Sequence, residues 1–208
     1  MKESLRDRQR AQIRADIRRA AFRLFIERGY DAVTTEEIAA AAGVSPRTLF
    51  RHVPTKEELL LAPVRHGGAA IISLLDERPA GESPDVALIN AIVTRTRSFD
   101  QADCEEWRRA LPVAPDLLDK VTIHTTGDKK RTTDLVAARM GVDPDADIRP
   151  GLLVQLAFAA ADFAFRQWVR QSGNSWPLDR YVTEALEAVK SPYWKRKSKS
   201  CMPSQPDC

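Results

Sequence analysis

Two short helix signals follow one another closely near the amino terminus, and they limit what this chain can fold into. Thr34, with Glu37 three residues later, is typical of a capping box at a helix start. After the tight turn 43–45, Ser45 occupies an N-cap position and Pro46 takes the first helical position, where a missing N–H costs nothing. Two short helices joined in this way predict a helix-turn-helix.

The second helix of this unit carries side chains suited to DNA. In a helix-turn-helix, the second helix enters the major groove with its first residues directed towards the base edges. Arg47 and Thr48 lie in that first turn, where arginine can pair with guanine O6 and N7 and threonine can contact a thymine methyl or a phosphate. Arg51 and His52 follow one turn later, and Lys56 lies at the next helix start. We expect these three side chains to contact phosphates.

The charge of the chain is unevenly distributed. The 208 residues carry a formal net charge of +3, which divides into +5 over residues 1–56, −6 over 57–189 and +4 over 190–208. Basic ends around an acidic body favour contact between a polyanion and the amino-terminal segment. Ordinary solvated helix surface is the alternative reading of the same distribution.

Helical periodicity continues along the rest of the chain and predicts an all-α protein. A first helix is expected over about 5–28, and a fourth begins after Thr55, with Pro63 either kinking it or ending its first turn early. Further helices are expected over about 84–99, 103–111, 115–140, 148–171 and 177–189, and Gly127 is an alternative break point within the third of them. The basic segment 191–208 has no periodicity and is predicted to be a disordered tail. It either keeps the protein soluble or adds non-specific attraction to phosphates.

Several classes of protein and site are disfavoured. The longest apolar stretch is interrupted by Asp162 and Arg166, and the charged amino terminus lacks the apolar core of a secretory signal. We therefore expect a cytoplasmic protein that is not in a membrane. Cys104, Cys201 and Cys208 lack metal-ligand spacing, which predicts free thiols, no zinc site and no disulfide framework. No cofactor is expected.

The segments "LFIERGYDAVTTEEIAAAAGVS" and "PRTLFRHVPTKEELL", within residues 13–61, resemble the DNA-binding domain of TetR-family (tetracycline-repressor-like) regulators. The resemblance covers roughly a quarter of the chain and implies an all-helical homodimer on a palindromic operator, with a larger carboxy-terminal domain that binds a small molecule and dimerises. Members often carry aromatic residues at the positions of Phe50 and Arg51, so here a cation replaces one aromatic contact and Phe50 is expected in the core. Carried over by position, the resemblance implies DNA contacts at Thr34 or Thr35, Ser45, Arg47, Thr48, Arg51, His52 and Lys56.

The resemblance also suggests a division of the chain. We expect a helix-turn-helix DNA-binding domain over 1–54, a helical ligand-binding and dimerisation domain over 55–190, and the tail over 191–208. By analogy with TetR-like dimers, helices at about 151–171 and 178–189 are predicted to form a four-helix interface between two subunits.

Candidate effector contacts are large side chains on the helices that enclose the ligand in similar proteins. For each of them, ordinary core packing is the alternative. Asp162 is a further candidate, with an i,i+4 ion pair to Arg166 as the alternative. The set is Trp107, Leu111, His124, Phe158 and Asp162.

The function predicted from these residues is a ligand-responsive transcriptional repressor that is released from DNA by a small molecule. A protein that coats nucleic acid without specificity is a second hypothesis, which the base-reading side chains of a recognition helix disfavour. An enzyme with an incidental helix-turn-helix is a third, and the chain has no GxGxxG, P-loop, HExxH or GxSxG motif to support it.

Overall fold

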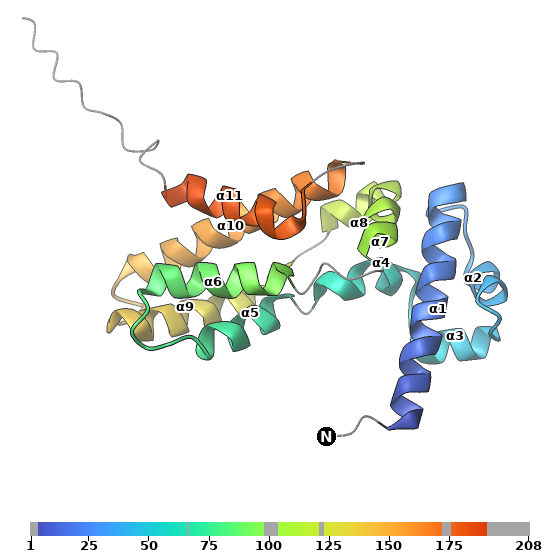
Figure 1. Cartoon of the computed structure of the whole chain (residues 1–208), viewed down its shortest axis with the longest axis horizontal. Helices are drawn as coiled ribbons and strands as arrows, with labels where there is room; N and C mark the ends of the chain where they lie inside the picture. The colour runs from blue at the N-terminus through green and yellow to red at the C-terminus, as the bar shows by residue number, and fades with distance from the viewer. Residues whose placement is uncertain (1–3, 66, 98–103, 121–122, 172–175, 191–208) are drawn as a thin grey trace, which may run out of the picture.

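The computed structural model describes residues 4–65, 67–97, 104–120, 123–171 and 176–190, and every regular element in these ranges is helical (Figure 1). The all-α prediction is therefore confirmed for the described part of the chain. The predicted tail at 191–208 lies outside it. The elements in chain order are α1 (Leu5–Arg28), α2 (Thr35–Ala41), α3 (Pro46–His52), α4 (Lys56–Arg65), α5 (Gly67–Asp76), α6 (Pro84–Arg97), α7 (Cys104–Ala110), a 3₁₀ turn (Leu111–Val113), α8 (Pro115–Lys120), α9 (Thr126–Met140), α10 (Ile148–Arg170) and α11 (Leu178–Lys190).

Helices α1 to α3 form a small head at one end of the molecule (Figure 1). The inner face of α1 contributes Ile17, Phe22 and Phe25, and the short helices contribute Ile38 and Leu49, all of which are fully buried. Both predicted caps are present. Thr34 and Glu37 exchange the two hydrogen bonds of a capping box, and the Ser45 hydroxyl accepts from the Thr48 N–H. The turn between the short helices uses Gly43 at φ +67°, a conformation that other residues rarely adopt.

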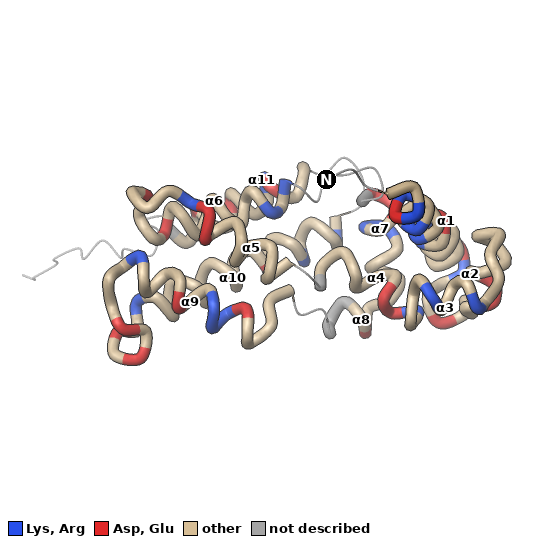
Figure 2. The backbone as a smooth tube through the Cα atoms, turned by 90° about the horizontal axis from the view of Figure 1, so that it is seen from below, with Lys and Arg blue, Asp and Glu red and all other residues tan. Residues whose placement is uncertain are grey.

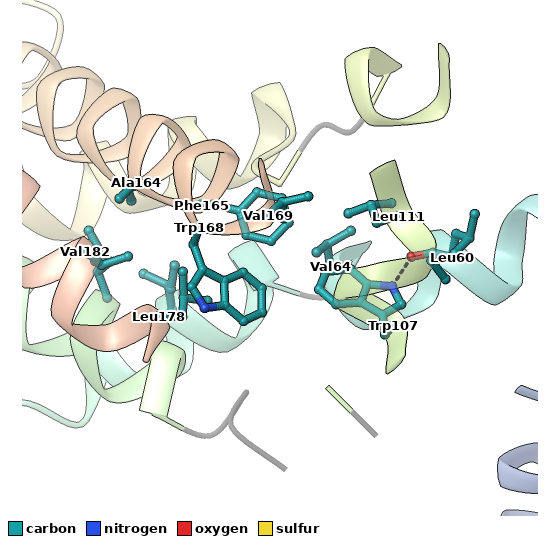
Figure 3. Close-up of a cluster of buried hydrophobic side chains, with 14 of the residues drawn as sticks. Leu60, Val64, Trp107, Leu111, Ala164, Phe165, Trp168, Val169, Leu178 and Val182 are labelled. Atoms are coloured by element: carbon teal, nitrogen blue, oxygen red, sulfur yellow. Dashed lines mark hydrogen bonds between the residues drawn. The ribbon is translucent and has the colours of Figure 1, made fainter. Parts of the chain in front are cut away.

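The rest of the chain forms a helical body around α10. One side of this long helix packs against α11, α9 and α6, and buries Val154, Ala157, Phe158, Ala161 and Phe165. Near the head, Trp107 of α7 joins the same core, where its ring lies 6.0 Å from that of Phe165 and 6.3 Å from that of Trp168 (Figure 3). The core is thus continuous from the body to the base of α4.

The structure decides between alternatives that the sequence left open at two places. The segment 115–140 is two helices and not one, because Thr125 and Asp128 form a capping box that starts α9. The side chains of Thr125 and Asp128 accept hydrogen bonds from backbone N–H groups that a continuous helix would use, and the helix is therefore interrupted before Gly127. Pro63 does not end the fourth helix early, since α4 continues through it to Arg65.

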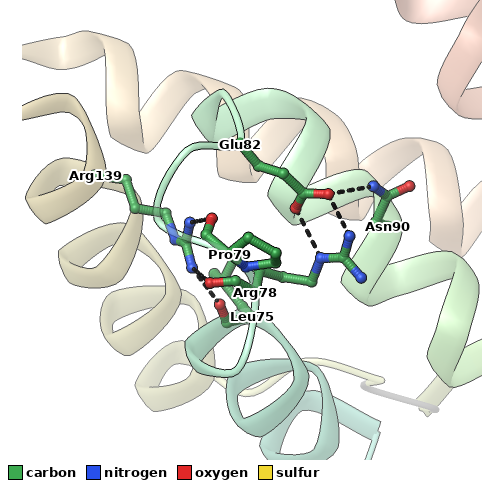
Figure 4. A network of polar contacts seen from close by, with 6 residues as sticks. All are labelled: Leu75, Arg78, Pro79, Glu82, Asn90 and Arg139. Atoms are coloured by element: carbon green, nitrogen blue, oxygen red, sulfur yellow. Dashed lines mark hydrogen bonds and ion pairs between the residues drawn. The ribbon is translucent and has the colours of Figure 1, made fainter.

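A polar network fastens the turn between α5 and α6 to α9 (Figure 4). The Arg139 guanidinium donates to the backbone carbonyls of Leu75, Arg78 and Pro79 at 2.7–3.0 Å. Arg78 pairs with Glu82, which also accepts from Asn90. The network satisfies carbonyls at the end of α5 that have no partner within the helix.

Helix α10 is long and apolar enough to pass a composition test for a membrane span, as is the stretch from Pro46 to Asp76. In the structure that second stretch is divided among α3, α4 and α5. One face of α10 lies in the protein core, and the helix carries the Asp162–Arg166 ion pair. Core packing accounts for the apolar composition of α10 on its buried side.

Candidate DNA-binding surface and effector cavity

Helix α3 presents basic side chains on the surface of the head. Leu49 faces the core and Val53 follows it inward, and His52 lies beside α1, whereas Arg47, Phe50 and Arg51 are exposed. Arg47 and Arg51 are exposed, and neither forms an ion pair with another residue in the described ranges. The Ser45 hydroxyl lies 3.0 Å from the Thr48 hydroxyl, which holds Thr48 at the start of the helix. Two unpaired cations on one exposed helix suit an anionic partner.

Helix α2 is capped at its start and tied to α1 by polar contacts. Thr34 serves as its N-cap, and the Thr35 hydroxyl donates to Glu36 at 3.1 Å. Glu37 pairs with Arg28 of α1 at 2.8 Å, and hydrogen bonds from Thr34 and Arg28 lower the pKa of this carboxyl. The two threonines thus lie at the amino-terminal end of α2. The Thr34 side chain already accepts from the Glu37 N–H, so only the other N–H groups of this first turn could bind a phosphate.

His52 lies at the end of α3 among positive charges. Its Nε2 atom is buried without a hydrogen-bond partner. Burial lowers the pKa of this imidazole below its usual value, and the nearby charges of Arg51, Arg14 and Arg10 lower it further. His52 is therefore neutral at pH 7 in the free protein, and an added phosphate would favour its protonated form.

Lys56 has partners within the protein that the sequence does not reveal. Its ammonium donates to the backbone carbonyls of Tyr30 and Val33 at 2.9 and 3.0 Å. These bonds use two of its three donors and tie the first turn of α4 to the connection between α1 and α2. Contact between Lys56 and DNA remains a prediction.

Phe50 is not a core residue, contrary to the expectation from sequence. Its side chain is 46% exposed, because the adjacent Leu49 takes the inward-facing position of this short helix. Neighbouring residues on a helix point about 100° apart, so both cannot face the same core. The structure therefore adds an exposed aromatic ring to the basic surface of α3.

A small cavity of about 50 Å³ lies in the helical body between α4, α5, α6, α10 and α11. Its wall is mainly apolar and includes Val64, Ile71 and Phe165. The polar residues that line it are Arg95, Thr96 and His124. A space of this size admits little more than a water molecule, so a larger ligand would require the surrounding helices to separate.

His124 is the candidate effector residue that the structure places at the cavity. Its ring stacks on Phe158 with centroids 3.8 Å apart and planes 13° from parallel. The side chain is 6% exposed, and its Nδ1 atom has no hydrogen-bond partner. Burial lowers the pKa of His124 to about 4, against a smaller opposing effect from Asp162 and Asp128. The imidazole is therefore neutral at pH 7 and has an unused polar atom beside an apolar space.

Trp107 and Leu111 lie elsewhere in the core and do not line the cavity. The Trp107 indole N–H donates to the backbone carbonyl of Leu60 at 2.7 Å, which joins α7 to the middle of α4 (Figure 3). Leu111 is fully buried in the 3₁₀ turn. Their contact with an effector remains a prediction, and the observed role of Trp107 is to hold α4 against the body.

Asp162 forms the i,i+4 ion pair that its spacing suggested. Its carboxylate accepts from Arg166 Nε at 3.0 Å, with both side chains partly exposed. Asp162 is near enough to His124 to influence its pKa, but it is not part of the cavity wall.

An apolar stripe runs along the outer face of α10. Ile148, Leu152, Leu156 and Phe163 follow one another at helical spacing, and all four side chains are exposed, Phe163 by 61%. No described element covers them. A stripe of large apolar side chains on a long helix marks an interaction surface, and Leu152, Leu156 and Phe163 lie within the segment predicted to dimerise.

Comparison with known proteins identifies the family of both regions. Residues 17–62 match the model of bacterial regulatory proteins of the tetR family, and residues 82–193 match that of the MftR C-terminal domain. The chain belongs to the TetR family. Regulators of this family bind operator DNA and dimerise. The helix-turn-helix at α2 and α3 is accordingly the DNA-binding unit.

The relatives of this TetR-family chain are regulators. It is 35% identical over 172 residues to the HTH-type transcriptional regulator TcmR of Streptomyces glaucescens, spanning 79% of this chain and 76% of TcmR. It is 26% identical to the HTH-type transcriptional activator FasR of Mycolicibacterium smegmatis, spanning 84% and 77%. The crystal structure of NalD from Pseudomonas aeruginosa, a secondary repressor of a multidrug efflux pump, has the same fold, with a TM-score of 0.57 at 20% identity over 86% of this chain and 96% of NalD.

The sequence reading missed two groups of residues. Arg95 and Thr96 line the cavity, and only the packing of α6 against α11 brings them there. Arg6, Arg10 and Arg14 of α1 line a cleft together with Arg51 and His52. Their four-residue spacing was a usable signal, since it places all three arginines on one helix face.

Proposed function

We propose that this TetR-family protein is a transcriptional repressor that binds a palindromic operator as a homodimer and is released by a small apolar effector. The observation that carries the DNA-binding part is the exposed, capped helix α3, with Arg47 and Thr48 in its first turn and no internal ion pair on Arg47 in the described ranges. DNA contact places such a protein in the cytoplasm.

On the operator, the residues of α3 have different roles. Arg47 is the base-reading residue, because a bidentate pair with guanine discriminates by about 1–3 kcal/mol. Thr48 and the exposed ring of Phe50 suit the methyl group of thymine. The remaining contacts, to the phosphates, would come from Thr34, Thr35, Ser45, Arg51, His52 and the third donor of Lys56.

The dimer supplies the second recognition helix. The apolar stripe on α10 would pack against its copy, with α11 beside it, and the two α3 helices would enter major grooves about 34–36 Å apart. This arrangement divides the chain into a DNA-binding domain over 1–54 and a regulatory domain over 55–190. A single subunit would contact only half of a palindromic site.

The effector would enter the cavity beside His124. A mainly apolar wall with a few polar groups suits a hydrophobic ligand that carries a hydrogen-bonding group. His124 would then pair through Nδ1, and stacking on Phe158 would keep its ring in place. Effector contacts of Trp107, Leu111 and Asp162 would require rearrangement of the core, so their proposed role is indirect.

Helix α4 connects the cavity to the head. Val64 at one end of α4 lines the cavity, and Lys56 at the other end is bonded to the α1–α2 connection. Enlarging the cavity would move α4, and the head with it, away from the spacing that the operator requires. Such coupling requires that the effector bind the released state more favourably than the DNA-bound state, by a binding free energy on the order of 1–3 kcal/mol.

A binding assay on operator DNA tests this proposal. DNA from the region upstream of the gene is compared with random DNA of equal length at one fixed salt concentration. We expect selective binding that Arg47→Ala with Thr48→Ala reduces towards the level of random DNA, while helicity and dimerisation are retained. Equal binding of wild type to both DNAs would support a non-specific coating protein instead.

A further inference from the structure

The first turns of α1 extend beyond the buried core of the head (Figure 1). Residues 4–12 are all exposed, and the first fully buried side chain of the helix is Ile17. At 1.5 Å per residue, the segment before Ile17 is about 18 Å long. An isolated helical segment of this length is marginal in water. None of its side chains is fully buried in the core.

The projecting segment carries like charges on one face. Arg6, Arg10 and Arg14 are spaced four residues apart, and none of them pairs with a carboxylate in the part of the chain that the structure describes. Like charges at i,i+4 repel each other and weaken a helix. This arrangement disfavours the free helix and favours an anion bound along its surface.

The same face meets the end of α3. Arg6, Arg10 and Arg14 line an open cleft whose opposite side is formed by Arg51 and His52. The basic positions of α1 and α3 appear in blue in Figure 2. The charges of Arg51, Arg14 and Arg10 all act on His52, which indicates that they converge on one place.

We propose that the start of α1 and the end of α3 form a phosphate-binding cleft that holds the backbone of operator DNA beside the bases read by α3. This inference rests on the proposed operator binding and adds a second contact element to it. Continuity with α3 favours a DNA strand over a free anion, because Arg51 and His52 belong to both surfaces. Phosphate contacts add affinity and fix position without reading sequence.

The experiment compares two double variants of the full-length protein. Arg10→Gln with Arg14→Gln removes two charges from the cleft, at exposed positions that do not touch the core. The control, Lys130→Gln with Arg131→Gln, removes two charges from exposed positions on α9, a helix of the body and not of the head (Figure 1). Operator and random DNA are titrated with each protein at several salt concentrations. Circular dichroism and light scattering verify helicity and dimerisation.

We expect the cleft variant to bind both DNAs on the order of tenfold more weakly, with the ratio between operator and random DNA preserved. The slope of log affinity against log salt should fall by about 3–4 for the dimer, since four arginines are lost and each phosphate contact contributes about 0.9. The control variant should retain the wild-type slope.

An unchanged salt slope in the cleft variant, or an equal decrease of the slope in the control variant, would overturn the proposal that the cleft binds phosphates. In either case, selective operator binding that depends on Arg47 would leave the proposed function intact. Failure of the wild-type protein to select any operator would instead contradict the proposed function itself. The two failures are therefore distinguishable in one set of titrations.

Discussion

The ammonium group of Lys56 lies 4.1 Å from the centroid of the Tyr30 ring and donates to the Tyr30 backbone carbonyl at 2.9 Å. A second bond reaches the carbonyl of Val33. Lys56 is the first residue of α4, whereas Tyr30 and Val33 belong to the connection between α1 and α2. One side chain thus fastens the head to the helix that enters the regulatory body.

Lys56→Met should destabilise the protein, because it retains the apolar stem but leaves the Val33 carbonyl without a donor and the Tyr30 carbonyl with only the 3.4 Å bond from the Val33 N–H. We expect the free energy of unfolding, measured by urea denaturation, to fall by about 1–3 kcal/mol. Lys130→Met is the control, since the exposed Lys130–Asp134 pair should contribute less than about 1 kcal/mol. If Lys56→Met weakened operator binding but left stability unchanged, Lys56 would act on DNA and not as a tie.

Gly68 allows α5 to approach α9 closely. A Cβ atom at Gly68 would lie 2.4 Å from Asp128 Oδ2, and this carboxylate is held in the capping box of α9. Gly68→Ala should therefore displace the cap and lower the free energy of unfolding by about 1–3 kcal/mol. Gly151→Ala in α10 has space, with its nearest neighbour at 4.0 Å, and should stabilise by about 0.5–1 kcal/mol. Equal effects of the two substitutions in thermal or urea unfolding would contradict the close approach.

His124 should make stability depend on pH. Its pKa is about 4 in the folded protein and 6.5 for an unperturbed histidine, so the unfolded chain binds the proton more readily between these values. The free energy of unfolding should therefore fall as pH decreases from 6.5 to 4, by about 2 kcal/mol at pH 5 and about 3 kcal/mol at pH 4. His124→Gln cannot titrate and should lose this part of the pH dependence. Parallel stability curves for wild type and variant over this range would exclude the effect.

The helix-turn-helix could be predicted from sequence because its determinants are local. The caps at Thr34 and Ser45 each depend on a residue three positions away, and Pro46 acts on its own backbone. The cavity could not be predicted in the same way, since Val64, Thr96 and Val182 come together only through the packing of α4, α6 and α11.

Phe50 and Lys56 show a second limit of sequence reading. The choice between core and surface for Phe50 depends on which of two adjacent apolar residues faces α1, and Leu49 takes that position. The partners of Lys56 are backbone carbonyls of residues 23 and 26 positions away, which no side-chain pattern indicates. In both cases the residue type was compatible with two environments, and tertiary structure decided between them.

The exposed stripe of α10 provides a test of dimerisation. Leu156→Glu with Phe163→Glu would place two carboxylates in an interface between copies, where each unpaired charge costs several kcal/mol. We expect the dimer dissociation constant to rise more than about 100-fold in analytical ultracentrifugation, with helicity retained because both side chains are exposed in the subunit. Ala138→Glu, at an exposed position on α9, is the control and should leave the dimer intact. The monomeric variant should also bind a palindromic operator at least about tenfold more weakly, because a single subunit holds only one of the two half-sites. A variant that remains dimeric would place the interface on another face and would remove the proposed basis for the spacing of the two heads.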